Sequence, residues 1–157
     1  MKKMLDKTIE QRENIIHKRK MTTDTTRKIL ELDIQYNLKK IGVDDGGIGF
    51  GVYSELMDIE GTKRKTIALN NASRPIEYDG EKSKKLLKEE MYFNLLTLME
   101  NKKIKLLDDD EVKASLASIQ YEDDKVFGSY SHIVEGIIRS AWLASKDKDL
   151  NIFAHSF

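Results

Sequence analysis

The hydrophobic positions of the chain form short apolar runs and longer stretches with a helical period. Short apolar runs bounded by polar residues predict strands, and apolar residues three and four positions apart predict amphipathic helices. The predicted strands lie at residues 40–43, 65–69 and 104–107, and the predicted helices at residues 22–36, 50–59, 85–101 and 131–145. A further helix follows residues 108–110, whose aspartates can cap it. This alternation of strands and helices predicts an α/β fold with parallel neighbouring strands.

Two segments show the shorter periodicity of hairpins. Isoleucines among polar residues predict two short strands within residues 8–21, with a turn at residues 13–14. Residues 121–127 predict a second hairpin, because two adjacent aspartates at residues 123–124 favour a tight turn. Both hairpins are expected to pair locally.

The remaining local features concern helix ends, loops and termini. Thr22 or Thr23 can cap the first helix, and in the helix after residues 108–110 the spacing of Val112 and Leu116 predicts that Ser115 faces solvent. Residues 74–84 contain the only proline and predict a surface loop. We expect a single domain over residues 1–157, with residues 1–7 and 146–157 as peripheral tails.

The last helix carries two adjacent apolar rows and one polar face. The rows predict that about two-thirds of its circumference is buried; they consist of Ile133, Ile137 and Ala141, and of Val134, Ile138 and Trp142. His132, Glu135 and Arg139 lie at i, i+3 and i+7 and so share the remaining face. A histidine and a glutamate one turn apart can bind a metal together, and the alternative interpretation is an ordinary polar surface.

Residues 39–52 contain the strongest candidate for chemistry. The apolar run at residues 41–43 leads directly into Asp44 and Asp45, and four glycines follow within six positions. In α/β folds the carboxyl end of a strand opens into the crevice that binds ligands. Asp44 is therefore a candidate site residue, with Asp45 as a possible addition, and the alternative for both is a polar turn.

The composition of the chain and the motifs that it lacks exclude some classes of site but leave DNA binding open. Lys plus Arg and Asp plus Glu both number 27, so the net charge neither favours nor excludes DNA binding. The absence of cysteine excludes disulfides and thiolate sites. The glycine stretch does not match the dinucleotide fingerprint, and no phosphate-binding loop of the ATPase type occurs. Without a signal peptide or a membrane-length apolar run, we expect a cytoplasmic protein.

A cluster of lysines precedes and enters the helix at residues 85–101. It consists of Lys82, Lys84, Lys85 and Lys88. One interpretation is contact with DNA phosphates, and the other is the solvated start of a helix. The sequence does not distinguish between them.

Several motifs, taken in order, resemble a known family. They are VDDGGIGFGV at residues 43–52, NNAS at 70–73, EMYFNL at 90–95 and KIKLLDDDEV at 103–112. Together they are similar to the nuclease domain at the C-terminal end of the large subunit of viral DNA-packaging terminases. That resemblance implies an α/β fold of the ribonuclease H type, with a mixed sheet flanked by helices. The opening strand, which carries the first catalytic aspartate of this family, is missing from the pattern.

The resemblance also implies a metal site. Asp44 corresponds to the family's second metal-binding carboxylate, and His132 and Glu135 stand where the family has two aspartates at the start of the last helix. This arrangement is similar to the last helix of Holliday-junction resolvases. Asp44 and Glu135 would hold Mg²⁺ or Mn²⁺, two ions in a complete site, and His132 would assist at the water or the second ion.

The function implied is metal-dependent hydrolysis of phosphodiester bonds in double-stranded viral DNA during genome packaging. The lysines at residues 82–88 would guide the DNA backbone without reading its sequence. Expected partners are double-stranded DNA, a terminase ATPase domain or upstream polypeptide, the small terminase subunit and the portal, with no membrane. The alternative is a noncatalytic or truncated ribonuclease H-like module that binds DNA or a packaging partner.

Overall fold

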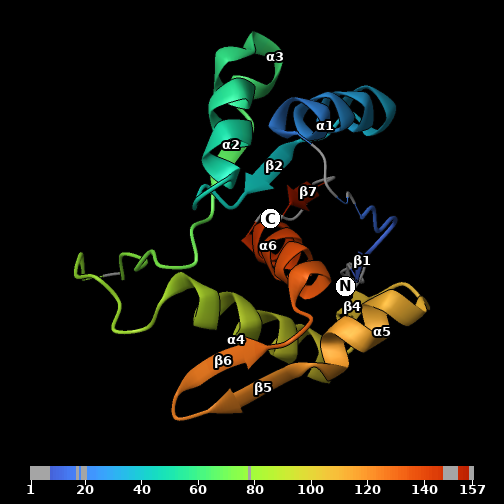
Figure 1. The fold of residues 1–157 in the computed structure, drawn as a ribbon. Coiled ribbons are helices and arrows are strands. Elements are labelled where there is room, and N and C mark those ends of the chain that lie inside the picture. Colours follow the sequence, from blue (N-terminus) through green and yellow to red (C-terminus); the bar gives the residue numbers. More distant parts are fainter. Residues whose placement is uncertain (1–7, 17, 19–20, 78, 147–151, 156–157) are drawn as a thin grey trace, which may run out of the picture.

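The computed structural model describes residues 8–16, 18, 21–77, 79–146 and 152–155, and it has a mixed α/β fold (Figure 1). The helices are α1 Thr22–Tyr36, α2 Gly49–Asp58, α3 Glu60–Lys63, α4 Leu87–Glu100, α5 Asp110–Ala117 and α6 His132–Lys146. The strands are β1 Ile9–Glu10, β2 Lys40–Val43, β3 Thr66–Ala68, β4 Ile104–Lys105, β5 Ile119–Glu122, β6 Lys125–Gly128 and β7 Ile152–His155. The predicted α/β class is thus confirmed.

The largest sheet among the described residues has three parallel strands in the order β3-β2-β7. Ile41 of β2 is in register with Thr66 of β3 and with Phe153 of β7. The parallel pairing of the strands predicted at residues 40–43 and 65–69 is therefore confirmed. The third strand lies in a segment predicted to be a peripheral tail, but residues 152–155 pair with the central strand.

The other strands form two separate pairs. β5 and β6 make the predicted antiparallel hairpin, and Asp123 and Asp124 form its turn with φ angles of 49° and 59°. The hairpin predicted within residues 8–21 is wrong, because β1 pairs in parallel with β4 instead. Gln11 extends that pairing, since its amide donates to the Lys105 carbonyl at 2.9 Å. In the described part of the chain the strands thus form three small sheets, and an arrangement of the ribonuclease H type remains a prediction.

The predicted helices form close to their expected ends. Of the two predicted helix caps, the one at α1 differs from the prediction and the one at α5 agrees with it. α1 begins after Met21, whose amide donates to Asp24 Oδ2 at 3.2 Å, whereas the hydroxyl of Thr22 donates to Glu55 in α2. The predicted threonine cap is therefore wrong, because Met21 is the N-cap residue and the first-turn aspartate bonds to its amide. Asp109 caps α5 as predicted, accepting from the Val112 amide at 3.0 Å.

Ser115 is buried, contrary to the prediction that it faces solvent. Its side chain has no exposed surface, and its hydroxyl donates to the Tyr130 carbonyl at 2.6 Å and accepts from the Val134 amide at 3.2 Å. Ser115 lies three positions after the buried Val112, so the helical period places both near the same face of α5, and α6 packs against that helix. The serine therefore satisfies polar backbone groups at the start of α6.

The buried apolar side chains form two clusters, which we call the α1–α2 core and the α4–α6 core. The α1–α2 core contains Ile29, Leu32, Leu38, Ile41, Val43, Val52 and Leu56. The α4–α6 core contains Leu69, Leu87, Met91, Tyr92, Leu95, Val112, Val126, Ile133, Val134, Ile137, Ile138, Ala141 and Leu143. Both predicted apolar rows of the last helix contribute to it, with Trp142 at its margin. Figure 1 shows α6 between the elements of the two cores.

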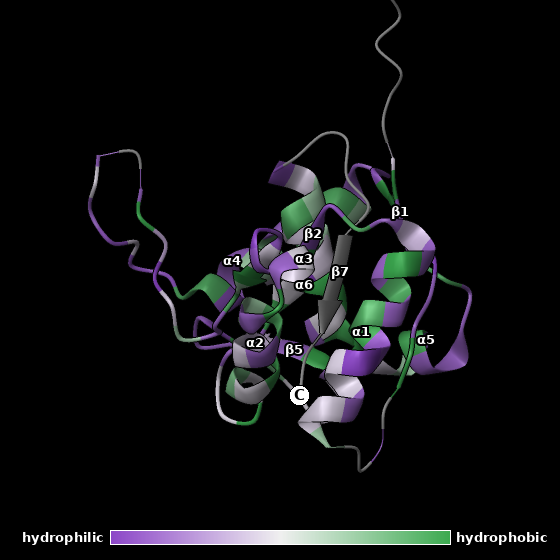
Figure 2. Cartoon of the chain, turned by 90° about the horizontal axis from the view of Figure 1, so that it is seen from above, coloured by the Kyte–Doolittle hydropathy of each residue, from purple (hydrophilic) through white to green (hydrophobic). Residues whose placement is uncertain are grey.

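The loop between β3 and α4 projects from the body of the molecule and is largely hydrophilic (Figure 2). Ile76 and Lys82 form an isolated antiparallel bridge within it, and residue 78 lies outside the described residues. The surface loop predicted at residues 74–84 is confirmed.

Candidate functional site

Asp44 lies at the carboxyl end of the central strand, immediately after the buried Val43. Its Oδ1 accepts from the Gly46 amide at 3.1 Å, so the side chain folds back over the turn. A Cβ added at Gly46 would lie 3.2 Å from that same oxygen, which is tight. A glycine here therefore leaves room for the carboxylate, whose second oxygen points to α6.

Arg139 of α6 meets Asp44 at this edge of the sheet. Its Nη2 donates to Asp44 Oδ2 at 2.7 Å and to Asn71 Oδ1 at 2.8 Å. Its Nε donates to the Leu69 carbonyl at 3.2 Å, just beyond β3. The arginine side chain has 0% exposed surface. One buried guanidinium thus joins the carboxyl ends of two adjacent parallel strands to the last helix.

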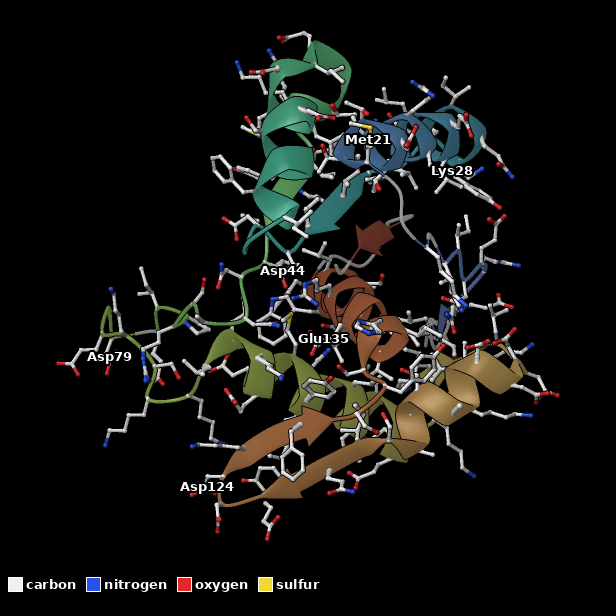
Figure 3. All side chains as sticks on the ribbon, in the orientation of Figure 1. Met21, Lys28, Asp44, Asp79, Asp124 and Glu135 are labelled. Atoms are coloured by element: carbon white, nitrogen blue, oxygen red, sulfur yellow. The ribbon has the colours of Figure 1, made fainter. Side chains whose placement is uncertain are left out.

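Glu135 lies one turn before Arg139 on α6 and completes the same cluster. Its Oε2 accepts from Arg139 Nη1 at 3.0 Å and from Asn71 Nδ2 at 3.2 Å. Its Oε1 accepts from the Tyr92 hydroxyl at 3.1 Å and lies 3.7 Å from Lys88 Nζ. Figure 3 shows Asp44 and Glu135 close together in the middle of the molecule, whereas Asp79 and Asp124 lie at its periphery. Two of the predicted site residues therefore converge.

The six side chains of this polar cluster balance in charge. The cluster consists of Asp44, Asn71, Lys88, Tyr92, Glu135 and Arg139. Its two carboxylates are matched by one guanidinium and one ammonium group. Buried charges are tolerated when they are paired and hydrogen-bonded. The geometry and the charge balance together indicate a rigid polar cluster at the edge of the sheet.

Tyr92 responds to this environment in a way that can be measured. Burial, together with the charge of Glu135 and the hydrogen bond to it, raises the pKa of Tyr92 above its ordinary value. Above about pH 10 the unfolded chain loses the phenolic proton while the folded protein keeps it, so stability falls as the pH rises. Wild type is therefore expected to lose up to about 1.4 kcal/mol more per pH unit than Tyr92→Phe above that pH.

Urea denaturation of both proteins at pH 9, 10 and 11 measures this difference. All other titrating groups are common to the two proteins, so their contributions cancel in the comparison. Parallel pH profiles for wild type and Tyr92→Phe would contradict a raised pKa at this position.

The donor set is compatible with a divalent cation in its chemistry but already holds a cation of its own. Asp44 Oδ2, Asn71 Oδ1 and Glu135 Oε2 all accept from one guanidinium. Mg²⁺ and Mn²⁺ prefer such carboxylate and amide oxygens. No group of three or more His, Cys, Asp or Glu side chains is arranged for metal binding in the part of the chain that the structure describes. A metal here would therefore bind two carboxylates and an amide oxygen and would replace Arg139.

His132 and Asp45 do not join the cluster. His132 is exposed at the start of α6, where its ring lies edge-on to Tyr130 with centroids 6.3 Å apart. The prediction placed it on one face with Glu135 and Arg139, but those two residues are buried. Asp45 is partly buried, and its Oδ1 has no hydrogen-bond partner.

The four predicted DNA-binding lysines fall into two groups. Lys82, Lys84 and Lys85 are exposed, and Lys85 Nζ lies 5.0 Å from the centroid of the Phe93 ring. Carboxylates interrupt this lysine group, namely Glu77, Asp79, Glu81 and Glu90. Lys88 is 25% exposed and lies beside Glu135 and 6.0 Å from the Tyr92 ring centroid. Lys88 therefore belongs to the polar cluster.

Sequence reasoning did not assign Asn71, Tyr92 or Arg139 to the site. Asn71 follows a strand predicted to be parallel to the one ending at Asp44, so its place at the same edge could have been inferred. Arg139 could have been flagged because the two apolar rows leave little of α6 exposed. Tyr92 gave no signal, since an aromatic residue in an amphipathic helix usually belongs to the core.

Comparisons of this chain with protein-family models, with curated proteins and with solved structures found no match. Among the described residues no helix has the length and apolar character needed to cross a membrane. The observations that bear on function are therefore the sequence motifs and the polar cluster around Arg139.

Proposed function

We propose that this domain is a divalent-metal-dependent DNA endonuclease of the ribonuclease H type, similar to the nuclease domain of terminase large subunits. The observation that supports it is the convergence of Asp44 and Glu135 at the carboxyl edge of parallel strands, both within 3.0 Å of one cationic group. The two residues are 91 positions apart in the sequence, and both are predicted site residues.

In this proposal Asp44, Glu135 and the Asn71 amide oxygen hold the metal ion. When bound, the ion activates water for attack on a phosphodiester and neutralises the developing charge. The Tyr92 hydroxyl fixes the orientation of Glu135 through its 3.1 Å hydrogen bond. The Gly46 amide fixes Asp44 in the same way from the turn after β2. His132 would assist at the water or a second ion from the exposed start of α6.

The proposed substrate is the backbone of double-stranded DNA. Lys82, Lys84 and Lys85 are exposed on the loop and at the approach to α4, where they can contact phosphates. Contacts of this kind position a duplex without reading its sequence. In a packaging machine the same domain would work with a terminase ATPase domain or upstream polypeptide, the small subunit and the portal.

A noncatalytic ribonuclease H-like module is the second candidate, and the arrangement of Arg139 favours it. Both carboxylates already have a buried positive partner, so the cluster is satisfied without metal. In that case the domain binds DNA or a packaging partner and has no turnover.

Plasmid nicking with Mg²⁺ and with Mn²⁺ distinguishes the two candidates. The endonuclease proposal expects metal-dependent nicking by the parent protein. The loss of a residue that only supports a metal ligand costs about 10–100-fold in activity. Asp44→Asn and Glu135→Gln each remove a carboxylate ligand itself, so we expect nicking to fall by more than about 100-fold in both. The matched control is Asp123→Asn, which makes the same chemical change in the exposed turn of the β5–β6 hairpin.

Circular dichroism melting of each variant separates loss of chemistry from loss of fold. Nicking that persists in both site variants would contradict the endonuclease proposal. Absent nicking by the parent, with salt-dependent DNA binding in a mobility-shift assay, would support the noncatalytic module.

A further inference from the structure

The guanidinium of Arg139 is completely satisfied by the protein. An arginine has five N–H donors. They have five oxygen acceptors here, namely the Leu69 carbonyl, the Glu135 carbonyl, Glu135 Oε2, Asp44 Oδ2 and Asn71 Oδ1. The distances run from 2.7 to 3.2 Å, and the side chain has 0% exposed surface. No donor of this group is left to contact a ligand.

Three of those five acceptors are the oxygens that a metal would need. Asp44 Oδ2, Asn71 Oδ1 and Glu135 Oε2 come from the turns after β2 and β3 and from α6, and all three accept from Arg139. Guanidinium and metal cannot share them, because a divalent cation beside a buried guanidinium is repelled by it. Occupation of the site by Arg139 and by metal is therefore mutually exclusive.

We infer that Arg139 is an internal counter-cation that holds the Asp44–Glu135 pair in the absence of metal and competes with a divalent ion for it. This inference rests on the proposed function and adds its regulation: metal binds only when the guanidinium withdraws from the carboxylates. If nine molecules in ten keep the guanidinium in place, the apparent metal affinity is weakened about tenfold. Arg139 is thus a positioning residue whose displacement switches the site on.

Two backbone contacts hold the guanidinium of Arg139 independently of the carboxylates. Its Nε and one Nη1 bond go to carbonyls of Leu69 and Glu135, and these bonds do not involve the carboxylates. The Nη2 atom makes only the bonds to Asp44 and Asn71. Because the guanidinium is planar and its donors keep a fixed geometry, release of Asp44 and Glu135 requires the whole group to move, and the two backbone bonds oppose that movement.

Mn²⁺ binding, measured by electron paramagnetic resonance of the free ion, tests this competition without relying on cleavage. Arg139→Met keeps the apolar stem and removes the charge, and it is expected to bind Mn²⁺ at least about tenfold more tightly than wild type. Arg139→Lys should fall between the two. Adding Asp44→Asn to Arg139→Met should abolish the gain. Arg27→Met, an exposed arginine of α1, is the matched control and should leave the affinity unchanged.

A second measurement follows the wild-type protein and needs a variant only to assign one resonance. The Nε–H resonance of Arg139, identified by its absence in Arg139→Lys, is followed during titration with diamagnetic Mg²⁺. A shift of this resonance and faster exchange of its proton with water would support displacement. A resonance that stays unchanged at saturating Mg²⁺, or equal Mn²⁺ affinities of wild type and folded Arg139→Met, would overturn the inference.

The outcomes for the inference and for the proposed function are separate. Tighter Mn²⁺ binding by Arg139→Met without nicking by any protein supports the counter-cation and contradicts the endonuclease. Nicking by wild type with no effect of Arg139 on metal affinity supports the endonuclease and overturns the counter-cation.

Discussion

Replacement of Glu135 by alanine is expected to lower the free energy of unfolding by about 3–5 kcal/mol, the usual cost of removing one partner from a buried ion pair. The change leaves Arg139 with one carboxylate and removes the acceptor of the Tyr92 hydroxyl. Both groups are buried, so water cannot replace the lost contacts. Urea denaturation at neutral pH measures the effect.

Two variants define how much of that loss comes from charge. Glu135→Gln keeps the shape of the side chain and one carbonyl acceptor. Its free energy of unfolding should fall by less, about 1–3 kcal/mol, because one of the buried donors to Glu135 loses its acceptor. Glu100→Ala, at the exposed end of α4, should change stability by no more than about 0.5 kcal/mol. If Glu135→Ala were as stable as Glu100→Ala, the cluster would not be held by this ion pair.

Replacement of Leu56 by alanine is expected to cost about 2–5 kcal/mol, through lost apolar burial and the cavity that remains. Leu56 of α2 has 0% exposed surface and belongs to the α1–α2 core, which is the smaller of the two. A small cluster has few neighbours that can move to fill a cavity, so we expect a value in the upper half of this range. Urea denaturation monitored by circular dichroism gives the measurement.

Leu96→Ala provides the comparison on an exposed surface. Leu96 lies on α4 with 49% of its surface exposed, and its truncation should cost less than about 1 kcal/mol. A loss of similar size for both leucines would mean that the α1–α2 core does not exclude water as described.

Local patterns predicted most helices and the central strand, because each carries its own periodicity. The central strand spans Lys40–Val43 as predicted, and α6 begins and ends within one residue of its predicted ends. β1 was assigned to the wrong partner, because a two-residue strand has no pattern that could identify β4 far along the chain. Residues 152–155 were missed for the same reason, since their pairing depends on a neighbour distant in sequence.

The candidate site was predicted only to the extent that secondary structure determines it. A strand end and a buried helix predicted Asp44 and Glu135, and the structure brings these residues together. His132 was grouped with them by helical spacing, but spacing does not show which side of α6 faces the sheet. The role of Arg139 depends on a long side chain that reaches two strand ends at once, and only the packed structure determines that reach.

The two apolar cores give the polar cluster a consequence for how the domain unfolds. Asp44 follows a strand of the α1–α2 core, whereas Tyr92, Glu135 and Arg139 lie on helices of the α4–α6 core. The contacts of Arg139 therefore cross the boundary between the α1–α2 core and the α4–α6 core, which are separate clusters of buried side chains. Cooperative unfolding units often coincide with such groups. Removal of a charge at this boundary is therefore expected to make the two cores unfold less cooperatively.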